Sequence, residues 1–109
     1  MLIATTDQLE NHHVQEVIGY VKGNAIKTKH LGNDIMASLK ALVGGEIREY
    51  DDMLNQARQM AISRMVQEAE EKGANAIIGF RMQNSAIMKS ASEIVAYGTG
   101  VKIEFPPNG

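Results

Sequence analysis

The chain has 109 residues, 11 of them basic and 13 acidic, which gives a formal net charge of −2 at neutral pH. This length suits one domain, to which we assign residues 1–105, with residues 106–109 as a C-terminal tail. The absence of cysteine excludes disulfides and thiolate metal sites, and the absence of a basic run argues against a nucleic-acid partner. Without a signal-peptide pattern or an apolar run of about 20 residues, we expect a cytoplasmic protein with no membrane partner.

The first third of the chain predicts two strands. Residues 1–5 are short and apolar, residues 6–13 predict a polar turn or loop, and residues 14–28 predict a second strand. Gly19 and Gly23 inside this strand indicate a bend or bulge, and a break near Gly23 is the alternative. Simple alternation places Val17 and Val21 on one face of the strand and Ile18 and Tyr20 on the other.

Two helices are predicted next. Residues 31–43 carry apolar side chains at helical spacing and end at a pair of glycines. Residues 50–72 predict a long amphipathic helix that ends at Gly73, because its interior lacks Gly and Pro and consists mainly of good helix formers. Its predicted apolar arc is wide enough to contact a neighbouring subunit as well as its own sheet. The arc comprises Met53, Leu54, Ala57, Met60, Ala61, Ile62, Met65, Val66 and Ala69.

The C-terminal part predicts two more strands. Residues 76–82 predict a third strand, because their side chains alternate, with Ile78, Phe80 and Met82 on one face. Residues 83–91 predict a turn, and residues 92–104 predict a fourth strand. One face of this last strand carries small residues, over which a helix or backbone could approach closely. The order β-β-α-α-β-β predicts an α+β two-layer subunit, with helices packed on one face of a mostly antiparallel sheet.

Arg58 interrupts the apolar face of the long helix. Asp51, two turns earlier, lies on the same predicted side. A buried guanidinium needs a carboxylate or carbonyl partner, so we predict an ion pair, within the chain or between subunits, with Asp34, Asp51 or Glu93. An anion-binding arginine in a crevice is the functional alternative.

A series of short matches in chain order resembles one family. The matches are Gly23–Ile26, the Asp34 helix ending at residues 43–45, Tyr50, Ala57-Arg58, residues 73–79, and Gly98-Thr99 with Val101. Together they resemble the YbjQ-like family, small bacterial proteins labelled “putative heavy-metal-binding”, and the resemblance covers roughly residues 2–103. The resemblance implies a dodecin-like subunit that assembles as a ring-shaped homopentamer and has no established activity. The chain departs from the family pattern at residues 29–31 and at Gly100, where the family usually has alanine.

Three histidines are the candidate metal ligands, since imidazole suits transition metals. His12 and His13 are adjacent in a polar stretch and need Glu10 or Glu16 to complete a site, so a solvated pair is the simpler interpretation. His30 precedes the first predicted helix and is expected as a turn residue. A ring would bring several copies of one histidine together around its axis, so we retain all three as candidates for a divalent or heavy metal ion.

The rest of the sequence contains no motif that predicts an enzyme. Of the seven methionines, Met53, Met60 and Met65 share the apolar face of the long helix, where methionine commonly fills gaps in a core. No nucleophile elbow, metalloprotease helix, phosphate loop or convincing carboxylate pair is present. Two hypotheses follow: a non-enzymatic homo-oligomeric ring that binds a heavy metal or small ligand, and a structural or protein-interaction ring without a ligand.

Overall fold

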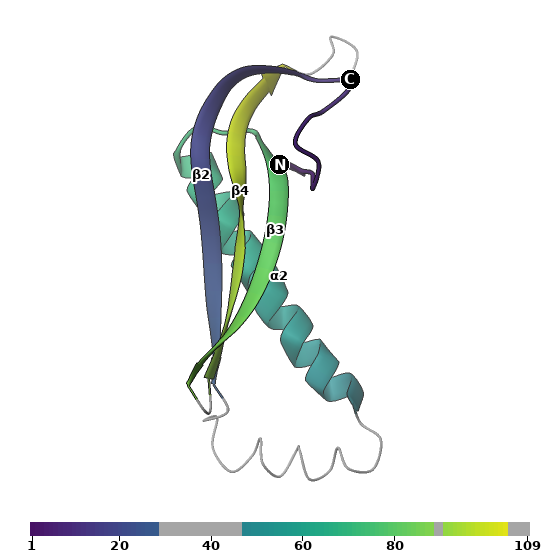
Figure 1. The fold of residues 1–109 in the computed structure, drawn as a ribbon, viewed down its shortest axis with the longest axis vertical. Helices are drawn as coiled ribbons and strands as arrows, with labels where there is room; N and C mark the ends of the chain where they lie inside the picture. Colours follow the sequence, from purple (N-terminus) through teal and green to yellow (C-terminus); the bar gives the residue numbers. More distant parts are fainter. Residues whose placement is uncertain (29–46, 89–90, 105–109) are drawn as a thin grey trace.

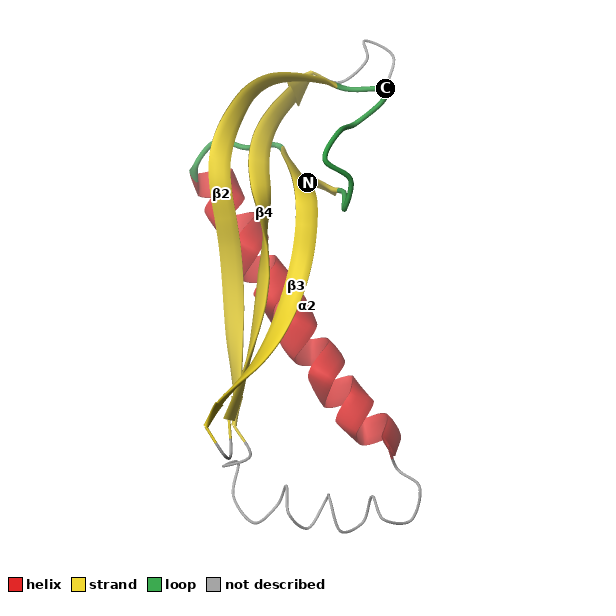
Figure 2. Cartoon of the chain, viewed as in Figure 1, coloured by secondary structure: helices red, strands yellow, loops and turns green. Residues whose placement is uncertain are grey.

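The computed structural model describes residues 1–28, 47–88 and 91–104. Figures 1 and 2 show a long, curved sheet with one helix crossing a single face. The predicted helix at 31–43 and the predicted tail at 106–109 lie outside the described residues. The described elements are β1 (Leu2–Ile3), β2 (His13–Thr28), α2 (Ile47–Glu71), β3 (Ala76–Met88) and β4 (Ala91–Glu104).

The four strands form one mixed sheet in the order β1-β3-β4-β2. The short β1 runs parallel to β3, whereas β3 and β2 each pair antiparallel with β4. This arrangement confirms an α+β fold with a mostly antiparallel sheet. The predicted turn at 83–91 is wrong, because β3 continues to Met88, which pairs with Ala91 of β4. Residues 81–86 are all exposed. This part of the strand therefore lacks the alternation of apolar and polar residues by which a half-buried strand is predicted from sequence.

A bulge at Gly19 changes the faces of β2. Val17 pairs with Val101 and Gly19 pairs with Gly100, which leaves Ile18 as the extra residue, and Gly19 has a φ of 125°. Ile18 therefore packs with Val21 against the helix-side core, whereas Val17 is 65% exposed. The prediction that Val17 and Val21 share a face is wrong for this reason. The strand has no break near Gly23.

A second bulge, at Gly79, changes the faces of β3. The register shifts between Ile78 and Arg81, and Gly79 has a φ of 61°. The N-terminal segment is hydrogen-bonded to β3 at this bulge: the Gly79 amide donates to Thr6 O at 2.8 Å, and the Phe80 amide donates to Ala4 O at 3.0 Å. Ile78 and Phe80 consequently belong to different hydrophobic clusters, and the prediction that they share a face is wrong.

The long helix confirms the strongest sequence prediction, with its start moved from residue 50 to Ile47. It ends in a Schellman motif: Gly73, with a φ of 89°, donates to Glu70 O, and Ala74 donates to Ala69 O. This helix end leads the chain directly into β3. Among the described residues, no helix is both long and apolar enough to cross a membrane.

Hydrophobic clusters lie on both faces of the sheet. On the helix side, a row spaced by four residues along α2 packs against β2 and β4. On the other side, a smaller cluster sits beneath the N-terminal segment. The first cluster includes Ala57, Ala61, Met65 and Ala69 of α2 with Val21, Ala25, Ile94 and Ala96; the second is Ala76, Val101 and Ile103, with Leu2 and Leu9 packed on it.

Candidate functional site

The sheet presents an apolar surface on the face turned away from α2, which we call the outer face. Since Val21 and Ala25 point toward α2, strand alternation points their neighbours the other way. Val17, Tyr20 and Ile26 are 65%, 59% and 58% exposed. The outer face is defined by these three β2 residues together with the partly buried Val95 and Tyr97 of β4.

Polar side chains also lie on the outer face, because Lys22 and Asn24 stand between Tyr20 and Ile26 on β2. The Asn24 Nδ2 donates to Glu93 Oε2 at 3.0 Å, across β2 and β4. On β3, the Arg81 guanidinium donates to the carbonyl oxygens of Thr5 at 2.9 Å and Phe80 at 2.8 Å, which ties the N-terminal segment down. Glu93, predicted as a partner for Arg58, is thus bonded to Asn24 within the chain.

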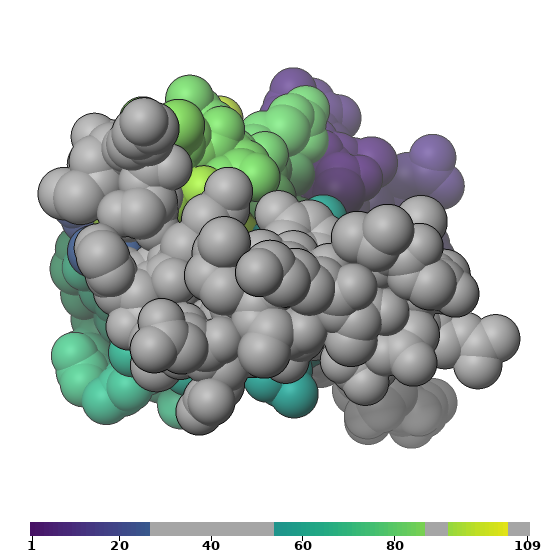
Figure 3. All heavy atoms as spheres, turned by 90° about the horizontal axis from the view of Figure 1, so that it is seen from below, coloured from purple at the N-terminus to yellow at the C-terminus, as the bar shows by residue number. Residues whose placement is uncertain are grey.

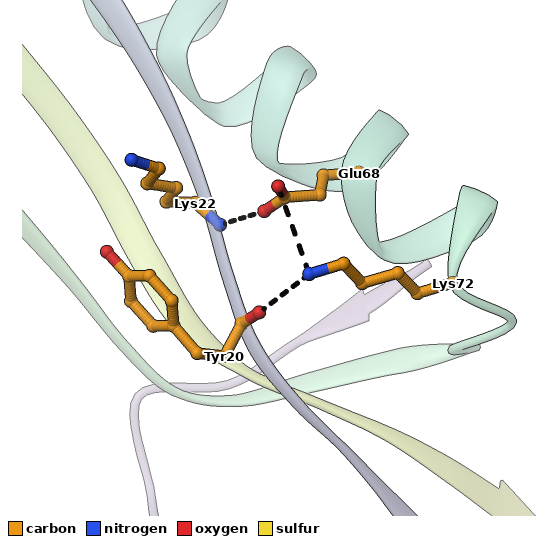
Figure 4. Close-up of polar contacts among 4 residues, drawn as sticks. All are labelled: Tyr20, Lys22, Glu68 and Lys72. Atoms are coloured by element: carbon orange, nitrogen blue, oxygen red, sulfur yellow. Dashed lines mark hydrogen bonds and ion pairs between the residues drawn. The ribbon is translucent and has the colours of Figure 1, made fainter.

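The free edge of β2 is bonded to side chains of α2, as Figure 4 shows for two of them. The backbone amide of Lys22 donates to Glu68 Oε2 at 2.6 Å, and Lys72 Nζ donates to Tyr20 O at 3.3 Å. Lys72 Nζ also lies 3.9 Å from Glu68 Oε1.

A third α2 side chain also reaches the β2 edge: Arg64 Nη1 donates to Asn24 O at 2.6 Å. We call Arg64, Glu68 and Lys72 the edge ladder. None of these three residues was predicted as a site residue from the sequence. The only signal of the edge ladder in the sequence is the four-residue spacing of three charges beside the apolar arc, which does not identify a partner 40 to 52 residues away.

The opposite edge of the sheet has no described neighbouring strand along much of β3. Strand β1 pairs only with Ala76 and Ile77 of β3, and the N-terminal segment bonds to Gly79 and Phe80. Beyond them, within the described ranges, no strand pairs with the outer edge of residues 81–88. Seen along the long axis, β3 and the N-terminal segment lie on the side of the molecule opposite α2 (Figure 3).

The candidate histidines fall at the start of β2. His13 is the first residue of the strand, is exposed, and pairs in register with the exposed Glu104 of β4. His12 is partly buried, and His30 lies outside the described residues. In the described part of the chain, no three His, Cys, Asp or Glu side chains gather closely enough to hold a metal ion. The described residues of one chain therefore provide at most a pair of ligands here, which does not by itself make a complete transition-metal site.

Arg58 does not lie on the buried side of α2. Next to Arg58 the buried row runs through Ala57 and Ala61, and helical spacing places Arg58 about 100° from Ala57 and about 60° from Ala61. Its side chain is exposed and Nη1 donates to Asn55 Oδ1 at 2.9 Å. The side chains of the predicted partners Asp34 and Asp51 lie outside the described residues, and an ion pair between subunits stays a prediction.

The exposed side of α2 carries a shallow, amide-rich hollow of about 810 Å³. Its described lining contains Arg64 and Met60 but not Arg58, so the hollow does not support an anion site at Arg58. Met60, which was predicted within the apolar arc, is 48% exposed here. The apolar arc is therefore wider than the surface that packs on the sheet.

Comparisons with known proteins agree on one family. The family model described as “Putative heavy-metal-binding”, of YbjQ type, matches residues 1–104. A UPF0145 protein of Halalkalibacterium halodurans is 57% identical over 104 residues, which cover 95% of this chain and 98% of the relative. A UPF0145 protein of Thermotoga maritima is 53% identical over the same shares. The names of these relatives state no enzymatic activity.

A solved structure supports the fold alone. The crystal structure of a DUF74-family protein of unknown function from Pediococcus pentosaceus superposes with a TM-score of 0.65 at 16% identity, over 95% of this chain and 98% of that one. Identity at this level carries no information on function.

Proposed function

Because the chain belongs to the YbjQ-like family, whose relatives have no named activity, we propose that it is a non-enzymatic protein that acts as a homo-oligomeric ring. The pentamer that the family resemblance implies is part of this proposal. One observation carries it: the apolar outer face, where Val17, Tyr20 and Ile26 are all more than half exposed. Single exposed apolar residues are ordinary, but three on one strand face favour an interface.

The free energy gained by burying these three side chains is too small to hold an assembly together. Burying the exposed parts of Val17, Tyr20 and Ile26 contributes about 1–2 kcal/mol each. Association costs roughly 4–15 kcal/mol in lost translational and rotational freedom. A stable assembly therefore has to bury further surface as well, and we take the amide-rich hollow of α2, in which Met60 is 48% exposed, as the second contact surface.

The positions of the two surfaces favour a ring. The outer face and Met60 lie on opposite layers of one subunit, so contact between them joins different surfaces of two copies. Such head-to-tail contacts close into rings when the rotation between copies permits it. This arrangement supports a cyclic assembly over a two-fold dimer.

Replacing apolar outer-face residues tests the proposal. The double substitution Tyr20→Thr and Ile26→Thr removes apolar area while keeping side chains that suit strands. We expect the mass in solution, measured by light scattering, to fall toward that of the monomer. Glu16→Thr, at an exposed position of β2 outside the outer face, is the matched control and should leave the mass unchanged. A double variant with wild-type mass would reject the outer face as the interface.

Metal binding is a second candidate, favoured by one observation, the cross-strand pairing of His13 with Glu104. Paired residues on neighbouring strands have side chains close enough to share a ligand. Each copy would supply this imidazole and carboxylate, and further ligands would have to come from other copies or from the undescribed part of the chain, which includes His30.

Titration of untagged protein with Zn²⁺, Ni²⁺, Cu²⁺ and Co²⁺, followed by calorimetry, tests this candidate. We expect saturable binding that His13→Ala abolishes and Gln15→Ala, two residues further along the strand, retains. Absence of stoichiometric metal in the wild type would remove the metal candidate. Native mass spectrometry of the same protein then tests for a retained small ligand, and its absence would favour the structural or protein-interaction ring.

A further inference from the structure

Strand β2 lies at one edge of the described sheet, so the backbone groups on its outer side pair with no described strand. Tyr20, Lys22 and Asn24 alternate with residues that point toward α2, and beyond β2 the sheet has no further described strand. An edge of this length, 16 residues in β2, is a template for pairing with another chain unless it is covered or blunted.

The edge ladder matches these backbone groups in both spacing and polarity. Side chains four residues apart on a helix are separated by about 6.0 Å along its axis, and outward groups two residues apart on a strand by about 6.8 Å. The contacts run in opposite directions along the two elements, from Arg64 with Asn24 to Lys72 with Tyr20. Both cations donate to carbonyl oxygens, and the carboxylate of Glu68 accepts from an amide.

Close approach of the helix makes this match possible. Gly23 lies between the edge residues Lys22 and Asn24 and faces α2. A Cβ at Gly23 would overlap backbone atoms of Ala61, Arg64 and Met65. Only glycine lets α2 lie near enough to β2 for side chains on one row to reach its edge.

We propose that the edge ladder closes the edge of β2 to strand addition by a second copy of this chain. The occupant it excludes is the β3 edge at residues 81–88 of another copy, which no described strand covers, since every copy carries both edges. Pairing of β2 with β3 between copies is head-to-tail and adds strands without limit when it does not close. The ladder therefore directs association away from the β2 edge at Tyr20, Lys22 and Asn24.

Hydrogen exchange at one amide tests the ladder directly. In Glu68→Ala, the Lys22 amide loses its acceptor, and we expect its exchange, followed by NMR, to accelerate at least tenfold. Glu68→Gln keeps an acceptor oxygen and should keep most of the protection. Glu70→Ala, on the exposed side of the same helix turn, is the control and should leave the Lys22 amide unchanged. Wild-type exchange of this amide in Glu68→Ala would overturn the proposal.

The triple variant Arg64→Ala, Glu68→Ala and Lys72→Ala tests the consequence for assembly. We expect species larger than the wild-type oligomer, growing with concentration in light scattering, and increased thioflavin T fluorescence. Circular dichroism confirms that the variant is folded. A folded triple variant with the wild-type mass distribution would overturn the proposal. Arg64 also lines the hollow beside Met60. Loss of a ring contact there would lower the mass, whereas strand addition raises it, so the direction of the change separates this proposal from the proposed ring.

Discussion

The substitution Gly23→Ala adds one methyl group where β2 and α2 are in closest contact. The added Cβ would overlap backbone atoms of Ala61, Arg64 and Met65. A helix backbone cannot yield at one residue, so α2 has to move away from the sheet as a unit. This displacement separates the buried row of α2 from its cluster and lengthens the contacts of the edge ladder.

The expected cost combines two effects. Overpacking a well-packed site typically costs about 1–3 kcal/mol. The three ladder contacts are solvent-exposed, so screening limits their combined contribution to about 1–2 kcal/mol. We expect the free energy of unfolding to fall by about 2–5 kcal/mol, a large part of the roughly 5–15 kcal/mol of a domain this size.

Thermal unfolding followed by circular dichroism measures this effect at fixed protein concentration. At about 4 °C per kcal/mol for a domain of this length, the Tm should fall by roughly 8–20 °C. Gly19→Ala is the matched control: a Cβ there meets nothing within 4 Å, so only the strain of a φ of 125° remains, worth about 1–2 kcal/mol. A Gly23→Ala variant as stable as wild type, or more stable than Gly19→Ala, would refute the close helix contact.

Three further predictions concern the fold. Met65→Ala empties a fully buried position and should cost about 2–5 kcal/mol in urea unfolding, whereas Met60→Ala should cost less than 1 kcal/mol in the monomer. Asn75→Ala removes both side-chain bonds to the Ile103 backbone, at 2.8 and 2.9 Å, and should cost about 1–3 kcal/mol; a wild-type Tm would contradict this. Gly73→Ala forces alanine into a φ of 89° and should cost about 1–2 kcal/mol, with no change expected for Glu71→Ala beside it.

Long, periodic elements could be predicted from the sequence. The helix α2 has 25 residues with a consistent apolar row and a glycine stop, so pattern and propensity agree. Strands β2 and β4 are rich in β-branched residues, and both were located to within one residue at each end. The resemblance to the YbjQ-like family is confirmed by the family model and by relatives at 50–57% identity.

The faces of the strands could not be predicted, because each bulge inverts the alternation that follows it. One extra residue at Ile18 exposes Val17, and the bulge at Gly79 separates Ile78 from Phe80. Glycine in a strand indicates a bulge but does not locate the extra residue.

The candidate site was less predictable than the fold. Helical spacing predicted Arg58 on the buried side because it falls between Met65 and Ala69 in angle, but those residues lie two and three turns further along the helix, and beside Arg58 the core contacts are made by Ala57 and Ala61. The edge ladder depends on contacts between residues 40 to 52 positions apart, for which periodicity in one element carries no information. The pairing of His13 with Glu104 is likewise set by sheet register.

The mass of the protein in solution tests the central claim most directly. Light scattering at micromolar concentration should give a multiple of the 11.9 kDa subunit, a pentamer by the family resemblance, and a lower mass for the double variant Tyr20→Thr and Ile26→Thr. A wild-type protein that is monomeric at this concentration would contradict the account.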